Sequence, residues 1–242
     1  MWNPYCNNHY AKFERVTVYY PKSCCNVKPT PKPPISTTTT SSSTTTTTST
    51  SSTTTTTTTC NPECINDWAT TNLAVTKYAN GDNITYAPTD GDWAIANGTS
   101  TGAYCCPNGD CSLVAEYGYI YNGFAVSDPR GLAPLGYHVA TPTEWVSIGD
   151  CLGGASVAGG KLKEAGTSHW QSPNIAAINC INFTALPGGY RFPNGSFFLF
   201  GQNGFWWSST GNTYYSMSYL NGAIDTQFYN GGGGFSVRVK LN

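Results

Sequence analysis

Two histidines are the first residues of this sequence that could take part in chemistry. His138 lies in an apolar stretch, and His169 precedes Trp170. A histidine acts as a general base, or activates a nucleophile, when a nucleophile or carboxylate lies within its reach. Acidic residues are few, and Glu144 is explained as part of a helix cap. We therefore expect both histidines to be structural, with no catalytic residue and no enzyme activity.

The cysteines could form disulfides or bind zinc. Cys60 and Cys64 are four residues apart, and three others form a cluster at 105–111. Zinc sites usually combine CxxC pairs with histidines, and neither group has a CxxC pair or a nearby histidine. Disulfides are therefore favoured over metal. The ten candidates are Cys6, Cys24, Cys25, Cys60, Cys64, Cys105, Cys106, Cys111, Cys151 and Cys180.

The pairing of these cysteines is partly predictable. We expect Cys151, at the end of a predicted helix, to pair with Cys180, because the segment before Cys180 must return past that helix. A Cys60–Cys64 bridge and one bridge within the 105–111 cluster are weaker expectations, because adjacent cysteines leave the connectivity open. Disulfides persist in oxidising compartments, so we expect an extracellular protein or one at a cell or virion surface.

Three acidic residues are the nearest candidates for a calcium-dependent sugar site. Such a site needs clustered oxygen ligands. Asp90, Asp92 and Asp110 match no calcium loop in their spacing. We expect them to be solvated turn residues, and we expect neither a metal nor another cofactor.

The overall composition excludes two classes of partner. Of the 242 residues only 10% are charged, and the net charge is −1. Binding to nucleic acid or to an anionic membrane surface requires a basic patch. No apolar run is long enough for a transmembrane helix. Aromatic residues make up 14% and there are 26 glycines, which is typical of a loop-rich protein with many strands.

A hydroxyl-rich linker at 36–59 divides the chain into an arm (1–35) and a head (60–242). All twenty-four linker residues are Ser or Thr, so the linker cannot form a core. It is either a flexible spacer or an O-glycosylated rod, which would reach roughly 75 Å at about 3.1 Å per residue. The candidate O-glycosylation sites are Thr37, Thr38, Thr39, Thr40, Thr44, Thr45, Thr46, Thr47, Thr48, Thr53, Thr54, Thr55, Thr56, Thr57, Thr58 and Thr59.

Four N-x-[ST] sequons lie in the head, and each is weak evidence alone because the chain is rich in Asn and Thr. We expect some of them to carry N-linked glycans. The acceptor residues are Asn83, Asn97, Asn182 and Asn194.

The arm contains one strand-like segment at 13–20, which is β-branched and aromatic. It is either part of a small disulfide-bonded knot or a strand that completes the sheet of another copy, because a strand with free edges readily pairs with another strand. We expect the second arrangement, with Val16, Val18 and Tyr19 buried against a neighbouring copy.

The head shows one strong helix signal. Thr141 can cap a helix, Pro142 suits its first position, and Glu144 completes a capping box. The helix should end at 153–154, where two glycines follow one another. A second short helix is expected at 161–164, a buried strand at 117–126, and further strands at 184–186, 197–200, 204–208, 214–220 and 235–241, the last half-exposed.

Nine ordered blocks of the head resemble the Fibrobacter succinogenes major paralogous domain. They are WATTNL at 68–73, KYANGD at 77–82, GLAPLGYHV at 131–139, TPTEW at 141–145, GGKLKE at 159–164, HWQSPN at 169–174, ALPGGYR at 185–191, GFWWSST at 204–210 and GFSVR at 234–238. The resemblance implies an α+β, C-type-lectin-like head with two short helices, small antiparallel sheets and long loops. The formylglycine-generating enzymes share that fold and bind copper through cysteines, but these cysteines match no such motif.

Aromatic residues are the best candidates for ligand binding. The block Phe205-Trp206-Trp207 lies inside a family motif and is expected to fill the core. Four tyrosines near the glycines at 231–234 are expected to be exposed, and their faces could stack on sugars. They are Tyr214, Tyr215, Tyr219 and Tyr229.

The expected function is that of a non-enzymatic extracellular structural protein. A glycosylated linker would carry the head, and the arm would join each copy head-to-tail to the next, giving a homopolymeric filament or surface fibre. The alternative is a carbohydrate-binding adhesin, or a virion receptor-binding protein, in which the arm is the anchor and the head recognises a ligand.

Overall fold

The computed structural model describes residues 60–242, which correspond to the predicted head, and these residues mix helices and strands in an α+β domain. None of the helices in this part of the chain is long and apolar enough to cross a membrane. Several expectations lie outside the described residues: the strand at 13–20, Val16, Val18 and Tyr19, the disulfides of Cys6, Cys24 and Cys25, and the threonines of the linker.

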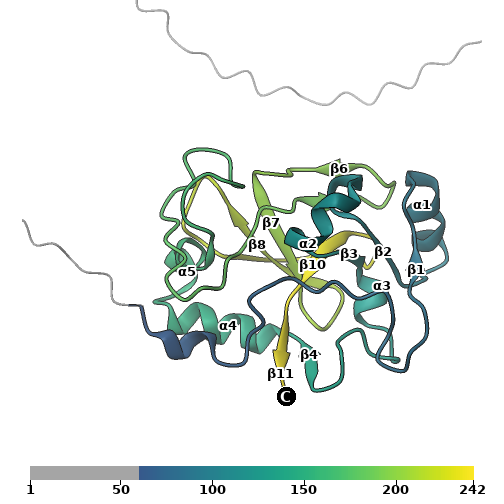
Figure 1. Cartoon of the computed structure of the whole chain (residues 1–242), viewed down its shortest axis with the longest axis horizontal. Helices are drawn as coiled ribbons and strands as arrows, with labels where there is room; N and C mark the ends of the chain where they lie inside the picture. The colour runs from purple at the N-terminus through teal and green to yellow at the C-terminus, as the bar shows by residue number, and fades with distance from the viewer. Residues whose placement is uncertain (1–59) are drawn as a thin grey trace, which may run out of the picture. The chain divides into compact units, whose positions relative to one another are not determined.

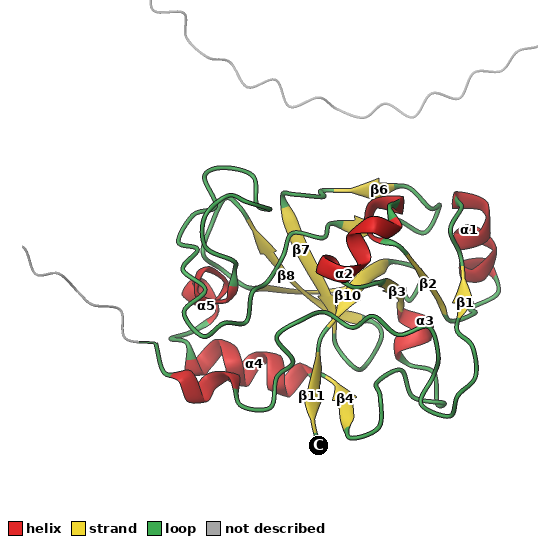
Figure 2. Ribbon diagram, in the orientation of Figure 1, coloured by secondary structure: helices red, strands yellow, loops and turns green. Residues whose placement is uncertain are grey.

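Helices and strands are interspersed as far as α5, seven strands follow α5 within the described residues, and long loops connect the elements (Figure 2). The helices are η1 (Pro62–Ile65), α1 (Asp90–Gly98), η2 (Pro107–Gly109), η3 (Cys111–Leu113), α2 (Val114–Tyr117), α3 (Gly123–Val126), α4 (Pro142–Cys151) and α5 (Ala155–Leu162), with η marking 3-10 helices. The strands are β1 (Thr85–Tyr86), β2 (Ala103–Cys105), β3 (Ile120–Asn122), β4 (Tyr137–Val139), β5 (Tyr190–Arg191), β6 (Phe197–Phe198), β7 (Asn203–Trp207), β8 (Thr213–Ser218), β9 (Asp225–Phe228), β10 (Gly234–Val237) and β11 (Val239–Leu241). The described part thus holds five α-helices rather than the two that we expected.

Nine strands form one mixed sheet. Its main order is β1-β2-β3-β10-β7-β8-β9, with β5 paired to β10 and β6 paired to β5. Two of the pairs, β1–β2 and β10–β7, are parallel. β4 and β11 form a separate antiparallel pair. The small antiparallel sheets that the resemblance implied are therefore wrong for the main sheet, which joins nine strands and contains two parallel pairs.

The alternation of side chains along β7 and β8 divides the core between the two faces of the sheet. Trp206 and Tyr215 lie opposite each other and pack with Trp145 of α4 and residues of α5. The next pair, Trp207 and Tyr214, points to the other face and belongs to a second cluster. All three residues of the block 205–207 are buried, which confirms that this block fills the core. In Figure 1, α4 and α5 lie together at one end of the head and α1 at the other.

The predicted start of α4 is confirmed in detail. The Thr141 hydroxyl accepts a hydrogen bond from the Glu144 amide, and the Glu144 carboxylate accepts one from the Thr141 amide. Trp145 and Ile148 on its inner face are buried, and the helix is followed by Gly153 at a φ of 98°. Local sequence alone specifies this element because both the cap and the stop use neighbouring residues.

The second predicted helix begins earlier than expected. α5 covers Ala155–Leu162 and begins directly after Gly154, whereas the sequence indicated 161–164. Two glycines lie in the part of the helix that was not expected, and one of them, Gly159, packs against the backbone of Ala223, so that a Cβ there would clash with the carbonyl of that residue. Close tertiary packing therefore outweighs the low helix propensity of glycine here.

Three further predicted strands need correction. Residues 117–126 contain the end of α2, the short strand β3 and α3, because Gly118 turns the chain at a φ of 70° and Asn122 caps α3. Residues 184–186 form a single bridge between Ala185 and Lys163. The last strand is divided into β10 and β11 at Arg238, which is buried rather than exposed. Residues 197–200, 204–208 and 214–220 match β6, β7 and β8 to within two residues.

The disulfides differ from the expected pairs. Cys60 pairs with Cys180, and Cys64 pairs with Cys151, so the expected Cys151–Cys180 and Cys60–Cys64 bridges are both wrong. η1 contains Cys64, begins two residues after Cys60 and packs against α4, so the start of the head reaches both distant partners. The bridge within the 105–111 cluster is Cys106–Cys111. Cys105, the remaining cysteine of that cluster, is a free, buried thiol, so the expectation that it takes part in a disulfide is wrong.

Buried basic side chains hold the long loops together. The Lys163 ammonium donates to the carbonyl oxygens of Ile175, Ser218 and Asn221 at 2.7–3.0 Å. Arg238 donates to Asn72 and to two backbone carbonyls, and its guanidinium lies over a phenylalanine ring. A buried cation satisfied by several carbonyls fixes segments that have no strand partner.

Candidate functional site

The two histidines contact carboxylates. His138 Nε2 lies 2.9 Å from a carboxylate oxygen of Glu144. His169 lies between two acids, with its Nδ1 2.8 Å from Glu164 and its Nε2 2.7 Å from Glu116. Within residues 60–242, no hydrogen bond joins either imidazole to a hydroxyl or a thiol. The arrangement links loops and helix ends, and it lacks the nucleophile that covalent catalysis needs.

The three candidate calcium ligands have separate structural partners. Asp92 completes the cap of α1 with Thr89. Asp110 accepts hydrogen bonds from the amide and hydroxyl of Ser112. Asp90 lies 3.3 Å from the guanidinium of Arg191. In the part of the chain that the structure describes, no three His, Cys, Asp or Glu side chains are grouped so that they could hold a metal ion.

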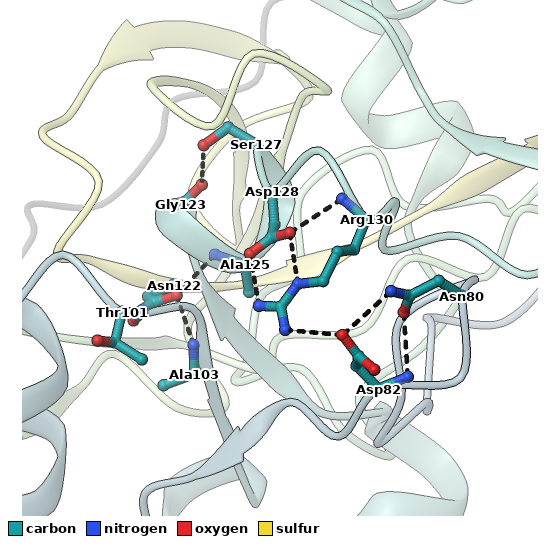
Figure 3. Close-up of polar contacts among 10 residues, drawn as sticks. All are labelled: Asn80, Asp82, Thr101, Ala103, Asn122, Gly123, Ala125, Ser127, Asp128 and Arg130. Carbon is teal, nitrogen blue, oxygen red and sulfur yellow. Dashed lines mark hydrogen bonds and ion pairs between the residues drawn. The ribbon is translucent and has the colours of Figure 1, made fainter.

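A charged network at the surface joins two turns (Figure 3). The Arg130 guanidinium pairs with Asp128 at 2.8 Å and with Asp82 at 3.3 Å, and Asp82 is also bonded to Asn80. Arg130 also lies over the ring of Tyr78 at 4.0 Å. The hydrogen bond from Arg130 outweighs partial burial and lowers the pKa of Asp128 to about 2. Every charge here has a partner, so the network is a link between turns rather than a site for a ligand.

An aromatic pocket on the sheet is the strongest candidate for a binding site. Four of its lining residues come from four different strands, and Leu199 and Tyr229 come from loops. The cavity has a volume of about 210 Å³. The lining residues are Tyr190 of β5, Leu199, Phe205 of β7, Tyr214 of β8, Tyr229 and Phe235 of β10.

Two further aromatic side chains contact residues that line this pocket. The ring of Phe198 stacks on Tyr190 at 5.6 Å, and Phe192 contacts both Phe198 and Tyr229. Phe192, Phe198 and Leu199 are each 40–46% exposed. Exposed apolar side chains next to a cavity are typical of a ligand-binding or protein-binding surface.

The pocket also contains polar groups. The Tyr214 hydroxyl donates to Gln227 Oε1 at 2.9 Å. Burial, followed by the proximity of Tyr190, raises the pKa values of Tyr214 and Tyr229 above their ordinary value of 10. Both phenols are therefore neutral near pH 7 and can donate or accept hydrogen bonds.

The structure brings two of the four predicted tyrosines to this pocket. Tyr214 and Tyr229 line it, although Tyr214 is buried rather than exposed. Tyr215 points to the opposite face, where it stacks on Trp145 at 5.0 Å and is also buried. Tyr219 packs at the edge of the same core cluster. Adjacent residues of a strand point to opposite faces of the sheet, so Tyr214 and Tyr215 cannot both face the pocket.

The sequence did not reveal three residues of the pocket. Tyr190, Leu199 and Phe235 come from β5, the turn after β6, and β10. They meet because β10 pairs with both β5 and β7, and these pairings join residues that are 43 and 30 positions apart in the sequence. The aromatic alternation of each segment was visible in the sequence, but the pairing that assembles the segments was not.

A family model described as the Fibrobacter succinogenes major domain matches residues 65–240. This range includes the pocket, the buried basic residues and all the strands except the last residue of β11. No curated protein and no solved structure matches the chain.

Proposed function

The chain belongs to the Fibrobacter succinogenes major domain family, and we propose that it is a non-enzymatic extracellular structural protein that assembles head-to-tail through its arm. In this proposal, the Ser/Thr linker is an O-glycosylated rod that spaces successive heads. The product is a homopolymeric filament or surface fibre, and no metal or cofactor takes part.

The observation that carries this proposal is the separation of charge along the chain. The arm has four lysines and one arginine against one glutamate, a net charge of +4, and the linker has no charge. The head has seven basic and twelve acidic residues, a net charge of −5. The arm of one copy is therefore attracted to the head of another, and this attraction accelerates and orients their association.

The cysteines support the extracellular location and the absence of chemistry. Of the seven cysteines in residues 60–242, six form disulfides, and such bonds persist outside the cytosol. Burial raises the pKa of the seventh, Cys105, to about 11. A thiol of this kind is protonated and enclosed, so it is a poor nucleophile and a poor ligand for copper.

We also propose that the head is a relative of the C-type-lectin-like fold. In support, β11 near the end of the chain pairs with β4, and Trp68 near the start of the head forms a bridge with Lys240 of β11, so the two ends of the domain meet. Long loops and two adjacent helices, α4 and α5, complete the likeness. Superposing an experimental structure of the head on lectin-like domains tests this assignment.

Arm variants of the purified full-length chain test the assembly. We expect the wild-type chain to form polymers in sedimentation and electron microscopy, and we expect removal of residues 1–35 to leave monomers. A milder variant changes Lys12, Lys22, Lys28 and Lys32 to Gln. It should weaken assembly, and assembly of this variant should depend less on the salt concentration than assembly of the wild type. A wild-type monomer, or an unchanged polymer after the deletion, would refute the proposal.

The aromatic pocket favours a second candidate function, a carbohydrate-binding adhesin. Apolar faces of sugar rings stack on aromatic side chains, and the neutral phenols of Tyr214 and Tyr229 offer hydrogen bonds. Its volume of about 210 Å³ is below the roughly 300–1,000 Å³ of common ligand sites, which suits one sugar ring. A glycan array with wild-type chain, Tyr229→Ala and the control Tyr219→Ala tests this. If Tyr229→Ala abolishes glycan binding and Tyr219→Ala does not, the result supports the adhesin.

A further inference from the structure

One edge of the main sheet is open. β9 is the terminal strand of the order, and it pairs through one side with β8. Within residues 60–242, no strand pairs with its other side. All four of its residues, Asp225, Thr226, Gln227 and Phe228, are exposed. The backbone groups along this side are therefore available to another strand.

β9 has little of the protection that usually blocks an open edge. Such edges are commonly very short or carry proline or lysine. At the opposite end of the sheet, β1 has two residues and Pro88 follows closely. β9 has four residues, with neither proline nor lysine among them. Phe228, its last residue, is 80% exposed.

The two faces of β9 differ in chemical character. Thr226 and Phe228 lie opposite Tyr215 and Thr213, so they belong to the face of the sheet that α4 and α5 cover. Asp225 and Gln227 belong to the other face. Among the ion pairs of residues 60–242, Asp225 takes part in none. An added strand that fits would present apolar residues to one face and a cation to the other.

We propose that residues 13–20 from the arm of a neighbouring copy add to β9 as a further strand of the sheet. This inference rests on the proposed assembly and identifies its docking surface. The arm segment Phe-Glu-Arg-Val-Thr-Val-Tyr-Tyr alternates in the required way. When Val16 and Val18 lie on the face of Phe228, the two-residue period places Arg15 on the face of Asp225.

The net charges of the whole arm and the whole head favour the arm as the occupant, whereas Glu14 and Arg15 cancel within residues 13–20. The arm carries a net +4 and the head a net −5, and Lys12, Arg15 and Lys22 lie within or beside the docking segment. The added strand forms main-chain hydrogen bonds with β9, and the side chains set its orientation and register. Tyr19 then lies on the face that carries the aromatic pocket, since Tyr214 lies opposite Gln227.

Site-specific photocrosslinking in the full-length chain tests the proposal. A benzophenone side chain replaces Val18, and the protein is assembled from an equal mixture of ¹⁵N-labelled and unlabelled copies. We expect cross-linked peptides that join position 18 to the β9 region, about half of them with mixed isotopes. Cross-links that map to another surface, or that join residues of the same copy exclusively, would overturn the inference.

Substitutions in β9 give an independent test. Phe228→Lys should reduce the association constant at least tenfold, whereas the control Ile95→Lys, at a 67% exposed position on α1, should leave it unchanged. Asp225→Lys and Arg15→Glu should each weaken assembly about two- to fivefold, and the double variant should recover most of the loss. Circular dichroism confirms that each variant is folded.

The results separate the docking site from the proposed function. If removal of residues 1–35 abolishes the polymer but Phe228→Lys and Asp225→Lys have no effect, the arm assembles the chain at another surface and the inference is wrong. If the deletion leaves the polymer unchanged, the proposed function itself is wrong.

Discussion

Cys64 and Cys151 form a disulfide although 87 residues separate them in the sequence. The bond joins η1, at the start of the head, to the last residue of α4. Cys60–Cys180 makes a second connection from the same short segment, across 120 residues. The first turn of the head is therefore anchored to two distant parts of the domain.

Loss of the Cys64–Cys151 bond should destabilise the head substantially. A cross-link across a long loop removes more conformational freedom from the unfolded chain than one across a short loop. We expect Cys64→Ser/Cys151→Ser to lower the free energy of unfolding by about 2–4 kcal/mol. Denaturant titration measures this loss. The matched control is Cys106→Ser/Cys111→Ser, which opens a loop of separation 5 and should lose about 2 kcal/mol or less. Equal losses would contradict the argument.

Lys163 should contribute more to stability than its neighbour Lys161. Burial lowers the pKa of Lys163 to about 8, so at pH 7 it is a charged group held by three carbonyls. Lys163→Met leaves these three acceptors without their donor, and we expect a loss of about 3–5 kcal/mol. Lys161 donates to one carbonyl, that of Leu152, and is partly exposed. Lys161→Met should therefore lose about 1 kcal/mol or less. Thermal and denaturant unfolding at pH 7 compare the two variants. Similar losses in the free energy of unfolding would show that the three hydrogen bonds of Lys163 do not have this stabilising role.

Sequence was sufficient where the determining contacts are local. The capping box of Thr141 and Glu144 and the stop at Gly153 depend on residues within a few positions, and α4 follows them. The burial of Phe205, Trp206 and Trp207 followed from their composition and from the family resemblance. Each of these features is specified without knowledge of the partner strand or helix.

Sequence was insufficient where distant segments must meet. The partner of Cys64 depends on how η1 packs on α4, and the aromatic pocket depends on β10 joining β5 and β7. The start of α5 was placed too late, because glycine has a low helix propensity and the close contact of Gly159 with Ala223 is a tertiary contact that the local sequence does not indicate. Parallel pairs such as β10–β7 give no local signal, because they need no tight turn between the strands.

The Glu144 carboxylate should make the free energy of unfolding depend on pH in the acidic range. Burial opposes its ionisation, but hydrogen bonds from the Thr141 amide, from His138 and from the Thr141 hydroxyl outweigh burial and lower its pKa to about 2. The ordinary value is 4.5, so the unfolded chain binds this proton at a higher pH than the folded chain. The stabilisation is complete above about pH 4.5 and is lost as the pH falls towards 2.

A single substitution isolates this effect. We expect Glu144→Gln to be less stable than wild type by on the order of 2 kcal/mol at pH 7, and we expect the difference to vanish near pH 2. The control is Asp150→Asn, an exposed position on the same helix, which should change stability by less than about 0.5 kcal/mol at pH 7. Urea unfolding between pH 2 and 7 gives the curves. A difference independent of pH would show that the charge of Glu144 is not the cause.

Asn97 should carry no glycan, although it lies in one of the four sequons. Its side-chain amide donates to the carbonyls of Pro193 and Gly232 at 3.1 and 2.8 Å, so both hydrogens of the nitrogen that a glycan would modify are already bonded. The other three acceptor residues, Asn83, Asn182 and Asn194, are exposed. Peptide mapping of protein from its natural source should find N-linked sugar at some of those three and unmodified Asn97. The structural role of Asn97 is tested separately: Asn97→Ala should lose about 2 kcal/mol, because two carbonyls lose their donor, and Asn83→Ala should lose almost nothing. A glycan on Asn97 in folded protein, or equal stability of the two variants, would contradict this assignment.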